Sequence, residues 1–505
     1  MDETNKVDKP YLSSNIEKNI SEFKKLCRDC DDIIMTRMEL GEQGQIPCFI
    51  AYVEVAVSTV MVEGTVLARL LNQIWNLPKE EFYQHIEKNG FGVSDARILD
   101  TMEDGINALM AGNAILFMEG YDKIIKISAK GYPNRGVPKA EVEKVLRGSQ
   151  EGFSDAVKVN TALIRKRIRD AKLKVKEQQI GVRSRTTLAL LYMDDLVEPA
   201  LLNEIRERLN SFKVDGVLDI GILEQLTEKS WYSPFPQFQY TERPDKAAMA
   251  ILEGKVVMLS DNSPSALILP TSYNNFFQTS DDFYNRFQMV TFIRILRYIA
   301  AIFAMFLPGA YLAVTNFHTQ VLPTNLVLSF AAAREGVPFP SVIEILLLEL
   351  AFELIREAGL RMPGPIGGTI ALVGGLIVGQ AAVTANLVSP IIVVLIAITA
   401  LSSFSIPNDE FSAAFRLIKF IMVLVCASLG MYGLVLGIFV VVTHLAKLKS
   451  FGYPYLAPFV AGEVNDYQDK RDAIIRYPAF MLKKRPIYTK ENARTRLKME
   501  RGKRR

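Results

Sequence analysis

The stretch that decides the fold is residues 418–446, which reads IKFIMVLVCASLGMYGLVLGIFVVVTHLA. Apart from Lys419 and His444, it carries no acidic or basic side chain. An α-helix needs about 20 mostly apolar residues to cross the hydrocarbon core of a bilayer. The stretch therefore predicts a membrane-spanning helix that is long enough to tilt or to project from the bilayer.

Three further stretches, 296–315, 366–389 and 390–406, have the composition of spanning helices. Arg294 and Arg297 flank the start of the first of these, and a basic tail follows residue 446. Positive charge collects on the cytoplasmic side of spanning helices. Both chain ends are therefore expected in the cytoplasm, which requires an even number of spans, four by this count.

A fifth apolar segment, 340–358, is interrupted by carboxylates, of which Glu349, Glu353 and Glu357 recur at every fourth position and share one helical face. Carboxylates are costly in lipid, so this face must meet water, protein or an ion path. It is either an interfacial helix with a solvated acidic stripe or an acidic vestibule that concentrates cations near a pore. If this helix spans the membrane, a weaker segment at 321–333 must also span to keep the number even.

The segment 366–389 carries two lines of residues on one helix. One line consists of small residues at a spacing of four, namely Gly367, Ala371, Gly375 and Gly379, which allow another helix to approach closely. The other contains the pore-lining candidates Gln380, Val383 and Thr384. Tight helix packing alone explains the first line, whereas a pore-lining helix in an oligomer explains both.

The half of the chain before residue 289 is charged and contains a duplication with a nearly constant offset. Residues 49–54 parallel 190–195, and residues 106–117 parallel 249–259. In each copy a helix ends at a glycine suited to a left-handed cap, and a strand follows at once.

The predicted fold class is therefore an α/β soluble N-terminal region with two similar subdomains, followed by an all-α transmembrane helix bundle. The predicted segments are a polar N-terminal segment (1–33), cytosolic α/β subdomain 1 (34–146), a basic helical connector (147–181), cytosolic α/β subdomain 2 (182–288), the transmembrane bundle (289–447) and a basic cytoplasmic tail (448–505).

Four charged residues near the connector and before a predicted helix are candidates for contacts between subunits: Arg147, Glu151, Glu242 and Arg243. The local alternative is a turn that caps the helix from Lys246 onward, with Asp245 as N-cap. The connector itself is predicted to contain one basic helix over 163–176, which is either a solvated link or a contact surface for a neighbouring subunit.

Enzyme and metal chemistry find no support in these residues. The pair Cys27 and Cys30 has no second pair to complete a zinc site, and the histidines are isolated in sequence. No phosphate-binding glycine loop and no nucleophile–base set is recognisable, so we expect neither an enzyme nor a cofactor. The net charge of +4 is too small to indicate nucleic-acid binding, and the basic run at the C-terminus favours contact with anionic lipids.

Several strings in both halves resemble one protein family, the GerA-type spore germination proteins. The strings are RGSQEGF (147–153), NTALIR (160–165), SPFPQ (233–237), TERPD (241–245), ILEGK (251–255), AREGVPFP (333–340), FELIREAGLRMP (352–363), VGQAAV (378–383) and FGYPYL (451–456). The resemblance covers roughly residues 35–485. Within the family, the chain looks most like the A subunit of a nutrient germinant receptor, and the stage V sporulation AF-type relative is the alternative.

The resemblance implies a location in the inner spore membrane and partners that no residue pattern in this chain identifies. The implied partners are a transporter-like B subunit that senses the nutrient and a lipoprotein C subunit. The implied assembly is a homo-oligomer, a pentamer in this family, that releases monovalent cations when nutrient is bound.

Two other function classes compete with the channel subunit. A secondary transporter predicts an inverted repeat in the membrane half, but the repeat lies only in the soluble half. A scaffold for other germination proteins predicts that changes at 366–389 spare function while disruption of 147–180 abolishes it.

Overall fold

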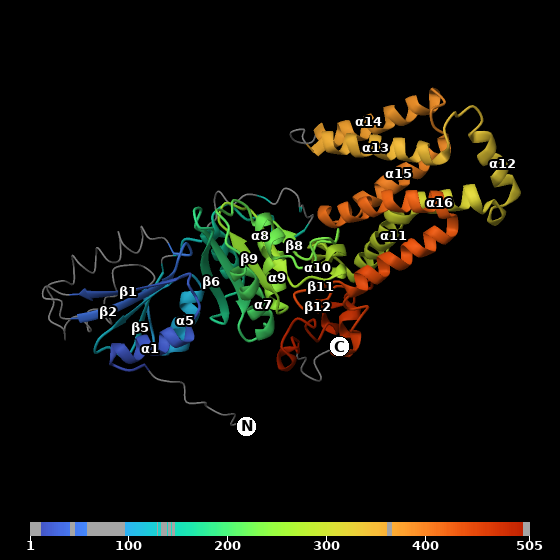
Figure 1. Ribbon diagram of the computed structural model, residues 1–505. Helices are drawn as coiled ribbons and strands as arrows, with labels where there is room; N and C mark the ends of the chain where they lie inside the picture. The colour runs from blue at the N-terminus through green and yellow to red at the C-terminus, as the bar shows by residue number, and fades with distance from the viewer. Residues whose placement is uncertain are drawn as a thin grey trace. The chain divides into compact units, whose positions relative to one another are not determined.

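The computed structural model describes residues 12–40, 46–57, 96–128, 130–132, 139, 143, 147–360 and 366–497. The chain forms two compact units (Figure 1). Unit 1 contains residues 1–228, 238–270 and 483–505, and unit 2 contains residues 229–237 and 271–482. The chain therefore passes between the units four times, and each unit is assembled from segments far apart in sequence.

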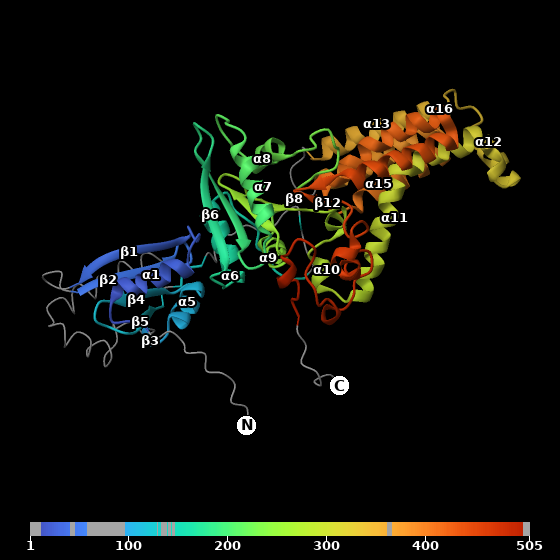
Figure 2. The same ribbon diagram turned by 60° about the horizontal axis from the view of Figure 1, so that its bottom comes forward.

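The first sheet of unit 1 is antiparallel throughout, with strand order β1-β2-β4-β5-β3. Its strands are β1 (Ile33–Leu40), β2 (Ile46–Val53), β3 (Ala96–Leu99), β4 (Ala114–Met118) and β5 (Ile124–Ile127), and its helices are α1 (Ile16–Leu26) and α5 (Met102–Met110). Both helices pack on the same face of the sheet (Figure 2). Phe23 of α1 is fully buried, with its ring centroid 5.8 Å from those of Phe49 and Phe117. Helix α1 thus belongs to this subdomain, which begins earlier than the predicted boundary at residue 34.

The second sheet repeats this topology with strand order β6-β7-β9-β10-β8, again antiparallel. Its strands are β6 (Leu173–Ile180), β7 (Thr186–Met193), β8 (Gln239–Thr241), β9 (Val256–Ser260) and β10 (Ala266–Leu269), and its helices are α6 (Val157–Arg167), α7 (Pro199–Asn210), α8 (Ile220–Thr227) and α9 (Pro244–Leu252). Helices α6 and α9 share the apolar cluster on one face of the sheet. The starts of β1 and β6, at Ile33 and Leu173, are offset as the duplication in sequence predicts.

The predicted glycine caps are present in both copies. Helix α5 is followed by Gly112 and helix α9 by Gly254, each with φ +84°. A side chain in this conformation is strained, whereas glycine adopts it freely. The left-handed residue lets the chain leave the helix and enter β4 or β9 almost at once. The internal repeat is therefore visible in the topology and in the cap that repeats with it.

The prediction of one basic helix over 163–176 is wrong. Helix α6 ends at Arg167, and Ile168 adopts an extended conformation. Asp170 then accepts hydrogen bonds from the backbone N–H groups of Lys172 and Leu173, which forms a turn into β6. The alternation of buried Leu173 and Val175 with lysines is the period of a strand. The second sheet consequently begins at residue 173 rather than after 181.

A buried ion pair joins the two subdomains within unit 1. Arg165 of α6 is fully buried and donates two hydrogen bonds to the carboxylate of Asp32, at 2.8 and 2.9 Å. Its guanidinium also donates to the backbone carbonyls of Asp170 and Leu173. A planar guanidinium suits this site because it satisfies several acceptors in fixed directions. The residue before β1 and the helix before β6 are thereby tied together.

Within the predicted tail, residues 448–482 belong to unit 2, and residues 483–497 belong to the second subdomain of unit 1. The Thr489 hydroxyl donates to the carbonyl of Glu253 at 2.7 Å, and the Lys490 N–H donates to the carbonyl of Leu196 at 2.8 Å. Arg485 donates to the carbonyl of Leu252. Residues 498–505 of the predicted lipid-contacting run lie outside the described residues. The chain after the last long helix thus returns to unit 1.

Unit 2 is mainly helical. Its longer helices are α11 (Phe287–Leu312), α12 (Thr324–Ala333), α13 (Ser341–Leu360), α14 (Ile366–Thr384), α15 (Pro390–Phe404) and α16 (Asp409–Lys447), preceded by the short α10 (Asp281–Tyr284) and followed by the two-residue strands β11 (Lys449–Ser450) and β12 (Tyr453–Pro454). Among the described residues, two helical segments are long and apolar enough to cross a membrane, Phe287–Phe317 and Asp409–Lys447. The predicted spans 296–315, 366–389 and 390–406 largely coincide with α11, α14 and α15.

The prediction of a single helix over 418–446 is wrong, because α16 reverses direction at Gly430. This glycine has φ 59° and ψ −137°, a conformation outside any helix. Residues 15 positions apart lie about 22 Å apart in a straight helix, yet Met422 contacts the position that a Cβ on Gly437 would occupy. The arms 409–429 and 431–447 therefore form a hairpin, and their reversal is visible in Figure 1.

Loss of the Arg165 guanidinium should destabilise unit 1 strongly. The substitution Arg165→Ala leaves the carboxylate of Asp32 buried and unpaired, which costs about 3–5 kcal/mol. Alkylation of Cys27 in the native full-length chain measures the resulting opening. This thiol is buried, and burial raises its pKa to about 12, so it reacts only when the structure opens.

The matched control is Arg183→Ala, because the Arg183–Asp215 pair is almost fully exposed. It should change the stability by at most about 0.5 kcal/mol and leave the alkylation rate of Cys27 unchanged. Equal alkylation rates in the two variants would contradict the structural role of the Arg165–Asp32 pair.

Candidate functional site

The three pore-lining candidates of α14 differ in their surroundings: two are exposed at the surface, and one packs in an apolar cluster. Gln380 and Thr384 are exposed, and the Thr384 hydroxyl donates to the backbone carbonyl of Gln380 at 2.8 Å. Val383 is half-buried in an apolar cluster that includes Ile392 of α15. The amide and the hydroxyl thus lie at the surface of this chain, where water or a second copy can meet them, while Val383 contributes to packing.

The small residues of α14 lie where neighbouring helices come close. A Cβ on Gly375 would lie 3.3 Å from the ring of Phe352 in α13, and one on Gly379 would lie 3.3 Å from a methyl group of Val393 in α15. These distances leave little room for a side chain. The surroundings of Gly367 and Ala371 are outside what the structure describes. Gly375 and Gly379 therefore serve packing within the chain.

The carboxylates of α13 are held by cations from the first arm of α16. Glu349 and Lys419 are both buried and form an ion pair. One helical turn further along α13, Glu353 accepts a hydrogen bond from Arg416 at 2.7 Å. Glu357 is exposed. The charges of Glu349 and Glu353 are thus neutralised inside the helical unit. The predicted acidic stripe did not include these cationic partners, because they lie on α16, far along the chain.

A second set of polar groups lies at the opposite end of α13. Glu344 is fully buried, and one of its oxygens accepts the N–H of Ser389, the N-cap residue of α15, at 2.7 Å. Arg334, which follows α12, lies 3.4 Å from the other oxygen. A carboxylate at a helix N-terminus is stabilised by the unpaired N–H groups and the helix dipole. Glu344 therefore fixes the start of α15 against α13.

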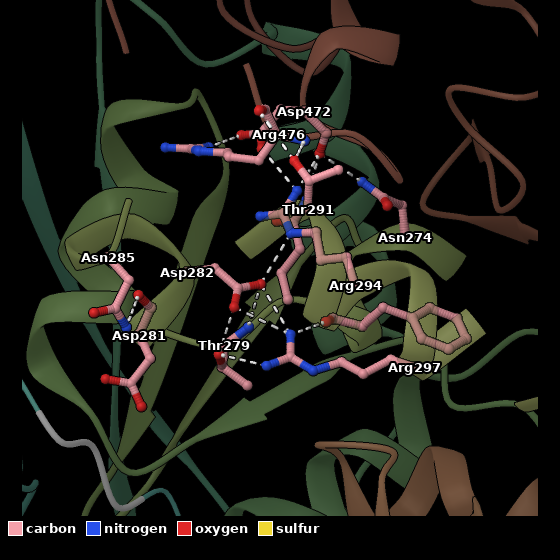
Figure 3. Close-up of polar contacts among 12 residues, drawn as sticks. Asn274, Thr279, Asp281, Asp282, Asn285, Thr291, Arg294, Arg297, Asp472 and Arg476 are labelled. Carbon is pink, nitrogen blue, oxygen red and sulfur yellow. Dashed lines mark hydrogen bonds and ion pairs between the residues drawn. The ribbon is translucent and has the colours of Figure 1, made fainter. Parts of the chain in front are cut away.

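The start of α11 is held by a buried ionic cluster (Figure 3). Arg294 has no exposed surface, and it donates to Asp282 of α10 at 2.9 Å and to Asp472 at 2.8 Å. Arg297 donates to the same Asp282 at 2.9 Å, and Arg476 pairs with Asp472. In the sequence, Arg294 and Arg297 indicated only the cytoplasmic side of the first predicted span. Their carboxylate partners were missed because one lies on the separate short helix α10 and the other lies beyond α16.

The candidates for subunit contacts have partners within unit 1. Arg243 is buried and pairs with Asp245 at 2.8 Å, while it also donates to the carbonyls of Glu143 and Ser149. Helix α9 begins at Pro244 with Arg243 as its N-cap residue, so the prediction of Asp245 as N-cap is wrong.

The other three candidates, Arg147, Glu151 and Glu242, differ in exposure. Glu151 pairs with Lys166 at 2.9 Å and with Arg167 at 2.6 Å. These cations hold the pKa of the Glu151 carboxyl below its ordinary value, against the opposing effect of its partial burial. The side chain of Glu242 is half-buried, and Arg147 is exposed.

The part of the chain that the structure describes contains no cluster of side chains suited to hold a metal ion. No three His, Cys, Asp or Glu side chains lie close enough there to hold an ion. Cys27 and Cys30 are free and buried, and Cys30 directs its thiol at the backbone carbonyls of Ala171 and Leu173. These cysteines contribute to the junction between the subdomains.

Comparison with known proteins identifies relatives along the whole chain. The sequence model of the Bacillus/Clostridium GerA spore germination protein family matches residues 21–488. The uncharacterized membrane protein YfkQ of Bacillus subtilis (strain 168) is 35% identical over 497 residues, which is 98% of this chain and 95% of that protein. Spore germination protein KA of the same organism is 35% identical over 95% of this chain and 88% of its own length. Spore germination protein GerLA of Bacillus cereus is 39% identical over 77% of this chain and 78% of its own length.

One solved structure also matches, the N-terminal domain of the A subunit of the Bacillus megaterium spore germinant receptor GerK3, with a TM-score of 0.41 and 24% identity over 52% of this chain and 98% of that one. The family resemblance carried by the strings in both halves is confirmed by the extent of the sequence match. The chain belongs to the GerA family of Bacillus/Clostridium spore germination proteins.

Proposed function

We propose that the chain is the A subunit of a spore nutrient germinant receptor, and that several copies of it form a nutrient-gated cation channel. Relatives that are named as spore germination proteins and align over most of their length support the role in germination. The exposed amide and hydroxyl of Gln380 and Thr384 on an otherwise apolar helix support the channel. Polar groups at membrane depth need protein or water as partners, and a shared axis between copies provides both.

The membrane is the proposed location, with both chain ends on the cytoplasmic side of the inner spore membrane. Residues 483–497 pack on the second subdomain, so the chain returns after α16 to the compartment from which it entered α11. The number of crossings is then even. We propose six, formed by α11, α13, α14, α15 and the two arms of α16.

The proposed partners are further copies of this chain, five in total as the family resemblance implies, together with a transporter-like B subunit and a lipoprotein C subunit. Nutrient recognition belongs to the B subunit in this proposal. We therefore assign no nutrient pocket, no catalytic residue and no cofactor to this chain. A channel of the stage V sporulation AF type, or a scaffold for other germination proteins, is the alternative to a receptor subunit.

Bulky substitutions on the exposed polar line should block cation flux. Gln380→Phe and Thr384→Phe are expected to reduce nutrient-triggered release of monovalent cations from spores by about tenfold or more, since a barrier increase of about 1.4 kcal/mol already lowers a rate tenfold. The measurement is cation release after nutrient addition, with protein level checked by immunoblot.

The matched control is Val378→Phe, because Val378 is also exposed on α14 but lies about 200° around the helix from Gln380. This variant should retain flux. Unchanged flux in all three variants would remove α14 from the pore and favour the scaffold.

Variants of the buried Glu349–Lys419 pair can distinguish whether the pair stabilises the fold or takes part in cation conduction. Lys419→Met alone should destabilise the protein by about 3–5 kcal/mol, because Glu349 is left buried and unpaired. The double variant Glu349→Met with Lys419→Met should restore folding, since apolar residues of similar volume replace a buried pair with little loss.

Thermal denaturation in detergent and cation release are measured on both variants. If the pair is structural, the double variant recovers both quantities. Recovery of stability without recovery of cation release would assign the pair to the ion path.

A further inference from the structure

Two sequence strings that lie far apart along the chain meet in unit 2. In SPFPQ (233–237), the carbonyl of Pro236 accepts a hydrogen bond from the Tyr455 hydroxyl at 2.9 Å. The carbonyl of Gln237 accepts one from the Ser450 hydroxyl at 2.7 Å. Tyr455 and Ser450 lie in and beside FGYPYL (451–456). The segment 229–237 is consequently held by unit 2, although the chain on both sides of it belongs to unit 1.

This segment is anchored at the open end of the α16 hairpin. The ring of Phe235 is buried, and its centroid lies 5.9 Å from that of Phe411 in the first arm and 6.1 Å from that of His444 in the second. The Ser233 hydroxyl lies 2.9 Å from Nε2 of His444. The anchor therefore lies level with the start of one arm and the end of the other.

The exposed charged residues of the hairpin lie at the same end. The first arm begins with Asp409 and Glu410, and Lys447 ends the second, whereas residues 420–443 contain no acidic or basic side chain. Exposed charged residues at the outer ends of two antiparallel arms, with exposed apolar side chains beyond them, mark the boundary between water and hydrocarbon, and the inner cations Arg416 and Lys419 are paired with Glu353 and Glu349 of α13. Segment 229–237 lies at this boundary.

Two aromatic rings project from the anchored segment without cover in this chain. Trp231 is 81% exposed and Tyr232 is 68% exposed, and their ring centroids lie 6.2 Å apart. Tyr232 is also 6.2 Å from His444, which places the pair beside the end of the second arm. Exposed tryptophan and tyrosine are unfavourable in water, but their apolar rings and polar N–H and O–H groups suit the headgroup layer of a bilayer.

The surroundings of the two rings match a lipid surface. The second arm of α16 exposes a row of large apolar side chains that leads toward them: Tyr432, Val435, Leu436, Phe439, Val440 and Val442. The exposed lysines Lys229, Lys447 and Lys449 lie next to the rings in sequence or follow the arm. Ammonium groups near the bilayer surface are attracted to anionic headgroups.

We propose that segment 229–237 is a membrane anchor whose Trp231 and Tyr232 rings insert into the headgroup layer of the lipid bilayer. The proposal rests on the membrane location proposed above. It gives the SPFPQ string a role: the string clamps the segment to the α16 hairpin and sets the depth of the two rings.

The chain contains two tryptophans, Trp75 and Trp231, so Trp75→Phe leaves Trp231 as the single fluorescent indole. The full-length variant is reconstituted into vesicles of phosphatidylcholine and phosphatidylglycerol that contain lipids brominated either near the glycerol or near the chain end. Trp231 should be quenched more strongly by bromine near the glycerol than by bromine near the chain end. Iodide in the water should quench it weakly.

A control tryptophan at a second depth distinguishes failure of the anchor from failure of the membrane assignment. Phe439 is 67% exposed on the second arm, so the variant Trp75→Phe, Trp231→Phe, Phe439→Trp should be quenched most by bromine near the chain end. If this control is quenched and Trp231 is not, the anchor is wrong and the membrane assignment stands. If neither indole is quenched by any brominated lipid, the membrane assignment fails as well.

The remaining outcomes also decide the proposal. Strong quenching of Trp231 by iodide without quenching by brominated lipid would place the ring in water and overturn the anchor. Protection from both quenchers would place the ring against protein, which would overturn the anchor in favour of a contact between subunits.

Discussion

A guanidinium that is removed from water must be given carboxylate or carbonyl partners, and the start of the helical unit depends on this requirement at Arg294. The side chain has no exposed surface, and Asp282 and Asp472 supply its counter-charges. Since one partner precedes α11 and the other follows α16, the cluster connects the entry and the exit of the helical unit. Arg297 also pairs with Asp282 and Arg476 with Asp472, so the cluster is a network in which Arg294 and each carboxylate have more than one partner.

The same requirement recurs at two other places with different consequences. In unit 1, Arg165 and Asp32 join two subdomains that each have a complete sheet of their own. In unit 2, Lys419 and Arg416 hold the carboxylates of α13. A cation that approached this helix would meet paired carboxylates rather than free ones, so its attraction would depend on whether the pairs separate.

Much of the fold follows from short-range patterns. The lengths of the apolar stretches predict the helices of unit 2, and the glycines after α5 and α9 predict the repeated cap. The strand β6 was missed because lysines at alternate positions were interpreted as a helical charge pattern, although the period of Leu173 and Val175 is that of a strand. The partners of Arg294 and of Glu349 come from elements far along the chain, and no local pattern contains that information. The reversal at Gly430 was missed because a long apolar run has the same composition whether it is straight or folded back.

With the proposed membrane location, that reversal also affects how the chain is inserted during synthesis. Because the turn at Gly430 contains no charged residue, the tip of the α16 hairpin is as apolar as its arms. Asp409, Glu410 and Lys447 lie at the open end of the hairpin, whereas Arg416 and Lys419 lie further along the first arm, where Glu353 and Glu349 of α13 pair with them. Insertion of both arms as a pair then requires no charged side chain to be transported across the bilayer, a step that is costly for acidic and basic residues.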